Sequence, residues 1–332
     1  MVVSPGAPYC SNTDCIHPMT ETNSQLAMVF PGQGSQAVGM LAELGAGHET
    51  VLETFREASG VLGYDLWSLC QQGPAEDLNQ THRTQPAMLA AGVAVWRVWC
   101  AQGGARPALM AGHSLGEYSA LVCAGALDFA EAVALVAERG RRMQAAVPTG
   151  VGAMAAILGL EDAQVIELCR QAEEGEVVAA VNFNSPGQVV IAGNHAAVER
   201  AMALAKAAGA KRALPLPVSV PSHCSLMQPA AEAFAASLAR VSLQAPEIPV
   251  LHNVDVQAHH DPDAIRAALA QQLYSPVRWV ETVQAMGRQG INHCLEMGPG
   301  KVLTGLNKRI DKALDTQAVY DPASLTAALE PG

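Results

Sequence analysis

A serine flanked by two glycines, Ser114 between Gly112 and Gly116, has the G-x-S-x-G spacing of a nucleophilic serine. The apolar run at 108–111 before it predicts a buried strand, and residues 118–124 after it predict a helix. A strand, a tight turn and a helix would expose such a serine at a helix N-terminus, where backbone N–H groups can stabilise an oxyanion. A Gly-Ser turn without chemistry fits the same short pattern, but the strand–helix context favours catalysis.

A nucleophilic serine needs a base, because an alcohol is a weak nucleophile at neutral pH. Among the ten histidines, His113 is a poor candidate, since neighbouring strand residues point to opposite faces. His223 lies in a Pro-Ser-His-Cys corner, a loop position between two expected domains, where active sites are common. A lone histidine is more often an ordinary surface or core residue, so the residues alone make His223 only the first candidate.

Composition limits the classes of protein that fit. The 332 residues are 50% hydrophobic, enough for a large core in one domain or in a large domain with a smaller one. A net charge of −11 and a pI of about 5.3 argue against a nucleic-acid-binding protein. The longest apolar run, 87–96, is far shorter than the roughly 20 residues that span a bilayer. Eight cysteines without a C-x-x-C pair indicate reduced core residues of a cytoplasmic protein.

The first 24 residues differ from the rest. They contain no Lys or Arg and no apolar segment of signal-peptide length, and they are rich in Ser, Thr, Pro and Asn. We expect a disordered extension over 1–24, and Met19 is an alternative start.

Strands and helices alternate along most of the chain, which predicts a parallel sheet covered by helices. The strands are expected at 25–30, 108–111, 249–254 and 293–297. The helices are expected at 48–59, 84–100, 118–124, 128–147, 227–240, 261–273, 277–287 and 301–313. Pro86 then lies in the first turn of its helix, and Asp128 with Glu131 has the spacing of a capping box.

The middle of the chain has a different order of elements. It reads strand, helix, strand, strand, helix, strand, at 152–158, 162–173, 177–182, 188–192, 196–208 and 211–216. This is the order of a ferredoxin-like unit. The fold class is therefore expected to be α/β, with a large α/β-hydrolase-like domain and parallel sheet (25–149 and 221–332) and a small inserted ferredoxin-like α+β subdomain (150–220).

Six motifs stand in the order and spacing of one enzyme family. They are Phe30-Pro31-Gly32-Gln33-Gly34-Ser35-Gln36, Gly112-His113-Ser114-Leu115-Gly116-Glu117-Tyr118, Asn182-Phe183-Asn184-Ser185-Pro186-Gly187-Gln188, Pro221-Ser222-His223, Gln272-Leu273-Tyr274 and Glu296-Met297-Gly298-Pro299-Gly300. From about residue 25 to the last helix, the chain resembles the malonyl-CoA:acyl carrier protein transacylases. It is more similar to the free-standing bacterial enzymes of fatty acid synthesis than to polyketide-synthase domains.

The resemblance implies a role for each matching position. Ser114 is implied as the acylated nucleophile, and His223 as its general base and then acid. The family orients the imidazole with a backbone carbonyl, carried here by Gln272, and uses no carboxylate. The backbone N–H groups of Gln33 and Leu115 are implied as the oxyanion hole. The other implied pocket residues are Met143 and Ser222.

Arg139 is implied as the ligand of the free malonyl carboxylate. Malonyl differs from acetyl by that carboxylate, and a planar guanidinium binds a carboxylate through two parallel hydrogen bonds. Arg139 has apolar neighbours at helical spacing, including Met143. The residues alone also allow, and would favour, a solvated arginine on the polar side with Glu138 and Arg141.

The implied reaction is ping-pong transfer from malonyl-CoA to the phosphopantetheine thiol of acyl carrier protein, with no metal and no bound cofactor. The residues His259, His260, Asp261 and Asp263 are better explained by an exposed loop with a helix cap at Asp261 than by a metal site. We expect a monomer in the cytoplasm, with no nucleic-acid or membrane partner. Carrier proteins of this kind are acidic, so transient docking needs a local basic patch. It is expected at Lys206, Lys211 and Arg212, with Lys301, Lys308 and Arg309 as further candidates.

Two other functions fit parts of the pattern. A serine esterase or thioesterase would use the same nucleophile, but it would have no use for Arg139. A non-catalytic acyl- or carrier-binding protein would form no covalent adduct on Ser114. The choice between malonyl, methylmalonyl and acetyl groups is also open, since a methionine such as Met143 adapts its shape easily.

Overall fold

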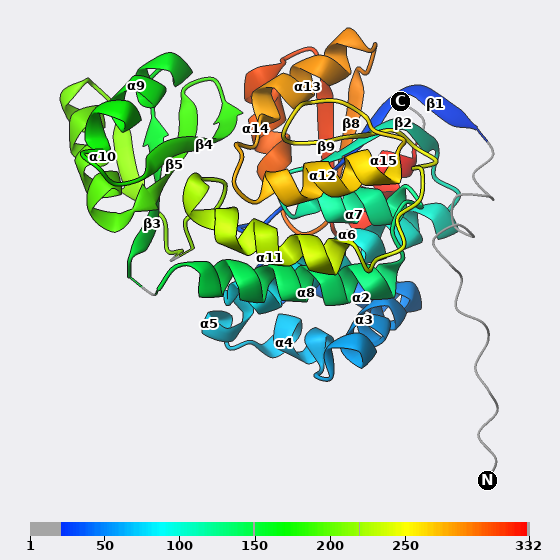
Figure 1. Cartoon of the computed structure of the whole chain (residues 1–332). Helices are drawn as coiled ribbons and strands as arrows, with labels where there is room; N and C mark the ends of the chain where they lie inside the picture. The colour runs from blue at the N-terminus through cyan, green and yellow to red at the C-terminus, as the bar shows by residue number, and fades with distance from the viewer. Residues whose placement is uncertain (1–20, 149, 219, 331–332) are drawn as a thin grey trace.

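The computed structural model describes residues 21–148, 150–218 and 220–330, and their strands form two sheets (Figure 1). The larger sheet has five parallel strands in the order β7-β2-β1-β8-β9. The smaller sheet has four antiparallel strands in the order β4-β5-β3-β6. The predicted combination of α/β class, parallel sheet and separate antiparallel sheet is thereby confirmed.

The central strand of the larger sheet is buried on both faces. The strands are β1 (Thr22–Phe30), β2 (Arg106–Gly112), β7 (Val250–Leu251), β8 (His293–Met297) and β9 (Asp315–Val319). Along β1, Leu26, Met28 and Phe30 belong to one core cluster, and Ala27 and Val29 to another. Since successive strand residues point to opposite faces, both faces of the sheet must be covered by helices.

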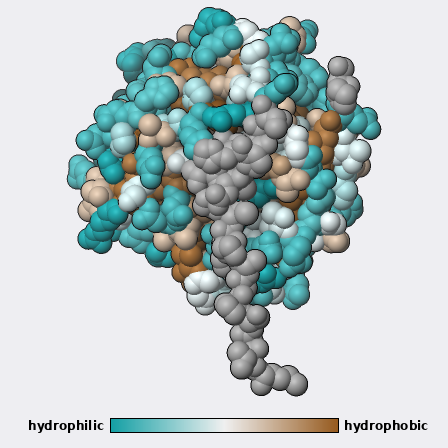
Figure 2. All heavy atoms as spheres, turned by 90° about the vertical axis from the view of Figure 1, so that its right-hand side faces the viewer, coloured by the Kyte–Doolittle hydropathy of each residue, from teal (hydrophilic) through white to brown (hydrophobic). Residues whose placement is uncertain are grey.

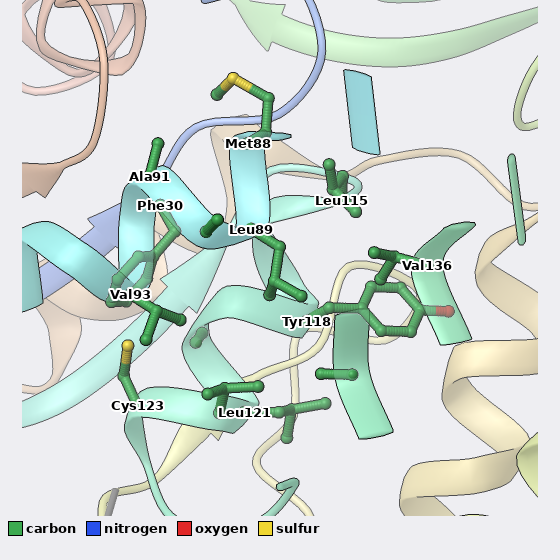
Figure 3. Close-up of a cluster of buried hydrophobic side chains, with 14 of the residues drawn as sticks. Phe30, Met88, Leu89, Ala91, Val93, Leu115, Tyr118, Leu121, Cys123 and Val136 are labelled. Carbon is green, nitrogen blue, oxygen red and sulfur yellow. The ribbon is translucent and has the colours of Figure 1, made fainter. Parts of the chain in front are cut away.

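Helices cover the two faces in separate groups. The helices of this part of the chain are α2 (Ala42–Gly47), α3 (Glu49–Leu62), α4 (Leu66–Gln72), α5 (Ala75–Leu78), α6 (Thr81–Ala101), α7 (Gly116–Cys123), α8 (Phe129–Ala146), η1 (Ser225–Met227), α11 (Gln228–Leu238), α12 (Pro262–Gln272), α13 (Trp279–Arg288), α14 (Val302–Ile310) and α15 (Pro322–Leu329). One core includes Leu89 of α6, Tyr118 of α7 and Val136 of α8 (Figure 3). The other includes Val283 of α13 and Leu303 of α14.

The smaller sheet lies beside the larger part of the molecule and carries its own helices (Figure 1). Its elements are β3 (Gly152–Leu158), α9 (Asp162–Ala172), β4 (Val178–Ser185), β5 (Gln188–Asn194), α10 (His195–Ala207) and β6 (Arg212–Pro215). Their order is the predicted one. A separate core cluster joins the two helices to the sheet, for example Val165 and Ala201 to Ile191. The small sheet therefore has a hydrophobic core of its own.

The first strand and helix α6 both begin earlier in the chain than predicted. The first strand begins at Thr22 rather than Gln25, because Thr22 pairs with Arg106 although its side chain is exposed. Residues 22–24 therefore belong to a strand and not to the predicted extension, whose residues 1–20 lie outside the described residues. Helix α6 begins at Thr81, so Pro86 lies inside the helix and not in its first turn. Burial of this long apolar helix in the core outweighs the missing proline N–H donor.

The last strand and helix were not predicted. The expected elements end at 313, whereas β9 and α15 follow in the structure. The strand sequence Asp-Thr-Gln-Ala-Val has little apolar alternation, yet it pairs with β8 along its whole length. Its pairing is a tertiary effect that a local pattern does not contain.

Among the described residues, no helix is long and apolar enough to cross a membrane. On the face in Figure 2, hydrophilic residues predominate and hydrophobic residues form small separate areas. The six cysteines of the described part, at 70, 100, 123, 169, 224 and 294, are buried, as predicted for core residues. Cys10 and Cys15 lie outside the described residues.

Candidate active site

The loops that carry the predicted site meet at one edge of the parallel sheet. Gln33 follows β1, Ser114 follows β2, and Asn253 follows β7. Gly298 follows β8, which is the neighbour of β1 on its other side. The carboxyl ends of parallel strands lie together at one edge of the sheet, and that edge is the usual ligand site of such sheets.

The turn at Ser114 is a strained strand-to-helix elbow. Ser114 has a φ of 52°, which side-chain-bearing residues rarely adopt. A Cβ on Gly112 would lie 1.8 Å from the carbonyl carbon of Gly116, and one on Gly116 would lie 2.0 Å from the carbonyl oxygen of Phe30. Glycine is therefore required at both positions, because strand and helix backbones approach too closely for a side chain.

Ser114 and His223 form a hydrogen-bonded dyad. Ser114 Oγ lies 2.7 Å from His223 Nε2, and His223 Nδ1 donates to the carbonyl oxygen of Gln272 at 2.8 Å. The carbonyl fixes the tautomer that leaves Nε2 free to accept the serine proton. His113 instead contacts Asn184, with 2.8 Å between His113 Nε2 and Asn184 Oδ1, so it points away from the dyad.

The surroundings of His223 keep it neutral. Burial lowers its pKa to about 3, and the positive charge of Arg139 acts in the same direction, while the carbonyl of Gln272 opposes both. A neutral imidazole is the form that can accept a proton. The structure therefore provides a base that is ready at neutral pH.

Arg139 points into the interior and not to solvent. Its guanidinium is fully buried, and it donates to Gln85 Oε1 and to Gln272 Oε1, both at 2.9 Å. The next two arginines on α8, Arg141 and Arg142, instead pair with Glu138 at the surface. The solvated alternative for Arg139 is thus excluded by the structure.

The two partners of Arg139 are neutral amides, so they orient the guanidinium without neutralising it. Burial lowers the pKa of Arg139, while the neighbouring Tyr118 and Glu117 raise it. Arginine remains protonated in proteins even when buried, since its intrinsic pKa is so high. A buried cation held by amide oxygens favours an anionic ligand, because a carboxylate would supply the missing opposite charge.

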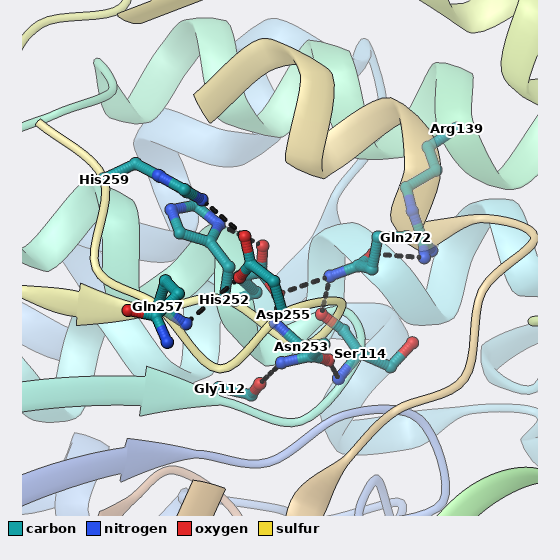
Figure 4. A network of polar contacts seen from close by, with 10 residues as sticks. Gly112, Ser114, Arg139, His252, Asn253, Asp255, Gln257, His259 and Gln272 are labelled. Atoms are coloured by element: carbon teal, nitrogen blue, oxygen red, sulfur yellow. Dashed lines mark hydrogen bonds and ion pairs between the residues drawn. The ribbon is translucent and has the colours of Figure 1, made fainter. Parts of the chain in front are cut away.

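A polar network behind the nucleophile escaped the sequence prediction (Figure 4). Asn253 Oδ1 accepts from Ser114 N, and Asn253 Nδ2 donates to Gly112 O, both at 2.7 Å. Glu117 accepts from the Asn253 N–H at 2.9 Å and from Gln272 Nε2 at 3.0 Å. The signals that could have revealed them are a charged residue inside an apolar helix and an asparagine two residues after a buried strand.

The remaining predicted residues lie near this centre or on the surface. Gln33 Oε1 accepts from Gln85 Nε2 at 3.3 Å, and Met143 Sδ lies 3.6 Å from the same nitrogen. Leu115 is the N-cap of α7, and Ser222 is half-buried beside the histidine. Lys206, Lys211 and Arg212 are exposed at the end of α10 and the start of β6. Asp261 Oδ2 accepts from Ala264 N at 3.2 Å, so it caps α12 as predicted.

The comparisons with known proteins agree with this geometry. A family model described as acyl transferase domain matches residues 27–319. The chain is 63% identical over 307 residues to the malonyl CoA-acyl carrier protein transacylase of Escherichia coli (strain K12), covering 92% of this chain and 99% of the relative. Identity to the protein of that name from Bacillus subtilis (strain 168) is 45%, covering 92% of this chain and 97% of the relative.

Two solved structures are similar throughout. An acyl carrier protein S-malonyltransferase from Vibrio cholerae has a TM-score of 0.90 and 64% identity, covering 91% of this chain and 99% of that one. A malonyl-transacylase solved in complex with its type II polyketide-synthase acyl-carrier protein has a TM-score of 0.91 and 59% identity, covering 92% of this chain and 99% of that one. The resemblance drawn from the six motifs is confirmed, and this chain belongs to the acyl transferase family.

Proposed function

We propose that this enzyme transfers the malonyl group of malonyl-CoA to the phosphopantetheine thiol of acyl carrier protein, and so supplies extender units for fatty acid synthesis. The single observation that carries this proposal is the fully buried Arg139, which is held by amides beside a Ser–His dyad. A general esterase needs the dyad but gains nothing from a buried cation. A malonyl group offers both a thioester for Ser114 and a carboxylate for Arg139.

The first half-reaction forms a malonyl ester on Ser114. His223 Nε2 takes the proton of Ser114 Oγ as the oxygen attacks the thioester carbonyl. The tetrahedral intermediate collapses by breaking the carbon–sulfur bond, and the imidazolium returns the proton to the CoA thiolate. The pKa of His223, lowered to about 3 by burial and by Arg139, makes it neutral before attack and a strong acid afterwards.

The second half-reaction repeats these steps with a different thiol. The phosphopantetheine thiol gives its proton to His223 and attacks the malonyl ester. The intermediate then releases Ser114 Oγ, which recovers the proton. A thioester is exchanged for a thioester, so the overall reaction is nearly balanced and reversible. The chemistry needs no metal and no bound cofactor.

The oxyanion hole is assigned to the backbone N–H groups of Leu115 and Gln33. Leu115 precedes α7, and the first N–H groups of a helix have no partner within it. The loop carrying Gln33 crosses the elbow, since a Cβ on Gly32 would lie 2.5 Å from His113 O. Met143 and Ser222 complete the acyl pocket. Two such donors stabilise the charge that develops in the intermediate.

Carrier docking is assigned to a basic patch at one end of the small sheet, formed by Lys206, Lys211, Arg212 and Arg309. Strand pairing supports this assignment, because Gln188, Leu158 and Arg212 lie side by side across β5, β3 and β6. Arg309 of α14 donates to Gln188 Oε1 at 2.8 Å, so its cation joins the same row. Asn184, which contacts His113 beside the nucleophile, lies just before Gln188 in the chain. The patch would thus lie near the active site.

The finer description of the molecule is also part of the proposal. We assign 25–149 and 221–332 to an α/β-hydrolase-like domain and 150–220 to an inserted ferredoxin-like subdomain. Support comes from the nucleophile elbow and from the strand order β4-β5-β3-β6 with antiparallel neighbours. We propose a monomer that works in the cytoplasm, where cysteines stay reduced, and that meets acyl carrier protein transiently.

The covalent intermediate provides the direct test. Incubation with malonyl-CoA should add one malonyl mass to the peptide that contains Ser114, and acyl carrier protein should remove it. The Ser114→Ala variant should take up no malonyl. A wild-type protein that binds malonyl-CoA without forming this adduct would be a binding protein and not a transferase. An adduct that only water removes would indicate a hydrolase.

Substitution of Arg139 tests the choice of acyl group. Arg139→Ala should lower kcat/KM for malonyl-CoA by about two to three orders of magnitude, since two charge-assisted hydrogen bonds are lost. The value for acetyl-CoA should change little or rise. Arg139→Lys should recover only part of the malonyl activity, because an ammonium cannot form both parallel bonds. An equal loss for both thioesters would contradict the assigned role.

A further inference from the structure

Glu117 is a fully buried carboxylate that the reaction above does not use. It lies in α7, three residues after the nucleophile, and its side chain has no exposed surface. An isolated carboxylate in such a place would be costly, so its partners must explain it. Those partners lead in two directions, to the nucleophile and to Arg139.

One direction runs through Asn253. Glu117 Oε2 accepts from the Asn253 N–H at 2.9 Å. The Asn253 side chain in turn accepts from Ser114 N and donates to Gly112 O, both at 2.7 Å (Figure 4). These two bonds bridge the turn on either side of the nucleophile. The carboxylate thus fixes the residue that holds the strained elbow in shape.

The other direction runs through the side chain of Gln272. Its Nε2 donates to Glu117 Oε2 at 3.0 Å and to Ser114 O at 2.9 Å. A carboxylate can only accept, so the amide must present its nitrogen to Glu117 and its oxygen to the opposite side. That oxygen accepts from Arg139 at 2.9 Å. The orientation of the amide, and with it the place of the guanidinium, depends on the buried carboxylate.

We infer that Glu117 is a positioning residue that couples the nucleophile elbow to the carboxylate-binding arginine, and so contributes to selectivity for malonyl over acetyl groups. This inference rests on the proposed function of Arg139. A single oxygen, Oε2, makes both positioning bonds, whereas Oε1 faces His252 Nδ1 at 2.7 Å. The role therefore depends on an acceptor at the place of Oε2 and not on the negative charge.

His252 and its neighbours lie on the Oε1 side of Glu117, away from the two bonds made by Oε2. Burial by itself lowers the pKa of His252, but the Glu117 carboxylate beside it and Asp255 have the larger combined effect and raise it. The His259 ring, whose Nε2 lies 2.7 Å from Asp255 Oδ2, is tilted against the His252 ring with 5.1 Å between the ring centroids. Glu117 Oε1 thus faces His252, while Oε2 accepts from Asn253 N and Gln272 Nε2.

Two substitutions of Glu117 separate the effect of the acceptor from that of the charge. Glu117→Ala should lower acylation with both thioesters about a hundredfold, because the elbow loses its support. It should also lower the malonyl-to-acetyl ratio of kcat/KM about tenfold, because the Gln272 amide can turn. Glu117→Gln keeps an oxygen for Asn253 and Gln272 and can face His252 with its amide nitrogen. It should keep that ratio within about threefold of the wild-type value.

Two further variants trace the two directions separately. Asn253→Ala should slow acylation with both thioesters and leave the ratio unchanged. Gln272→Leu keeps the backbone carbonyl for His223 and should mainly lower the ratio. In a Glu117→Ala background, each of these substitutions should have much less effect than in the wild type, since residues that act through one another are not additive. Additive effects would overturn the inference.

A matched control is Glu296→Ala, which removes another fully buried carboxylate. Glu296 accepts from the backbone N–H groups of Leu303 at 3.0 Å and Thr304 at 2.7 Å, at the start of α14. Its loss should lower the melting temperature and leave the malonyl-to-acetyl ratio unchanged. A shift of the ratio equal to that of Glu117→Ala would show that the ratio reports only loss of stability, and this would refute the inference.

If Glu117→Ala does not fold, the substitution Glu117→Asp provides the test. Glu117→Asp keeps the charge, but it lacks one methylene and cannot reach both Asn253 and Gln272. Its ratio should fall as for alanine, and an unchanged ratio would overturn the inference. A wild-type protein without a malonyl adduct on Ser114 would refute the proposed function itself. A normal adduct with an unchanged ratio in every variant would refute only the role of Glu117.

Discussion

His223 can accept the serine proton only in its neutral form, and its surroundings ensure that form by removing it from water and placing a cation nearby. The same surroundings affect folding. In the unfolded chain a histidine titrates near pH 6.5, whereas burial and Arg139 lower the pKa of His223 to about 3 in the folded protein. Between these values the unfolded chain binds a proton that the folded protein does not. The contribution of this residue is therefore complete above the unfolded pKa and decreases as the pH falls toward 3.

The resulting prediction concerns stability as a function of pH. From about pH 7 to about pH 5, this histidine should reduce the free energy of unfolding of the wild-type protein by about 2 kcal/mol. His223→Leu removes the titrating group, so the decrease measured by urea unfolding should be smaller by that amount. An identical decrease in both proteins would show that His223 titrates normally in the folded state.

The pH dependence of acylation tests the lowered pKa of His223 independently. Because His223 is already neutral, single-turnover acylation of Ser114 should stay nearly constant from about pH 8 down to about pH 6. Arg139→Lys also keeps a cation near His223. Its acylation should be slower than that of the wild type but equally constant from about pH 8 to about pH 6. A rate that halves near the ordinary histidine pKa would contradict the lowered value.

At the scale of elements, the elbow depends on contact between two backbones. Strand β2 ends at Gly112 and helix α7 begins at Gly116, and a Cβ on Gly112 would overlap the helix backbone at 1.8 Å. Backbone atoms cannot turn aside as the end of a flexible side chain can. The distance between Ser114 and His223 therefore depends on how closely this strand and helix approach.

Gly112→Ala should consequently displace α7, lower stability by several kcal/mol and reduce acylation about a hundredfold. Gly60→Ala in α3 is a suitable control, because a Cβ there meets nothing within 4 Å and the backbone is helical. It should raise stability by roughly 0.5–1 kcal/mol. Thermal unfolding and single-turnover acylation measure both effects. Full activity of a folded Gly112→Ala protein would show that the elbow tolerates a wider approach.

The elements with strong local patterns could be predicted, and those that depend on tertiary pairing could not. The elements of the small sheet are short apolar segments separated by polar or glycine-containing turns, so each of them was predicted within a few residues. In contrast, β9 is polar and acquires its strand conformation only by pairing with β8. The same difference explains α6. Its pattern predicted a start near residue 84, whereas burial of the helix keeps Pro86 inside a helix that begins at Thr81.

The candidate site shows the same limit at the level of residues. Ser114 and His223 stand in recognisable motifs, whereas the role of Arg139 was implied only by the family resemblance. The structure joins the first two and buries the third. Glu117 and Asn253 are separated by 136 positions, and their contact exists only because β2 and β7 are neighbours. Such a network follows from sheet order, which a single sequence does not reveal.

For the whole molecule, net charge affects how readily acyl carrier protein binds. The protein has a net charge of −11, so an acidic carrier is repelled at long range and needs a local positive region. Salt screens both effects, so the attraction between the patch and the carrier should weaken as the ionic strength rises. The proposed patch at Lys211 and Arg212 should therefore control carrier affinity and not acylation.

Lys211→Glu with Arg212→Glu should raise KM for acyl carrier protein about tenfold at low salt, because two attractive contacts become repulsive. Single-turnover acylation by malonyl-CoA should be unchanged. Added salt should raise the wild-type KM for the carrier and lower that of the variant, so that the two values converge. Arg56→Glu reverses an exposed charge on α3, away from the small sheet in Figure 1, and should have little effect. If the Lys211→Glu/Arg212→Glu variant and the Arg56→Glu variant had the same KM for acyl carrier protein, the carrier would dock on another surface.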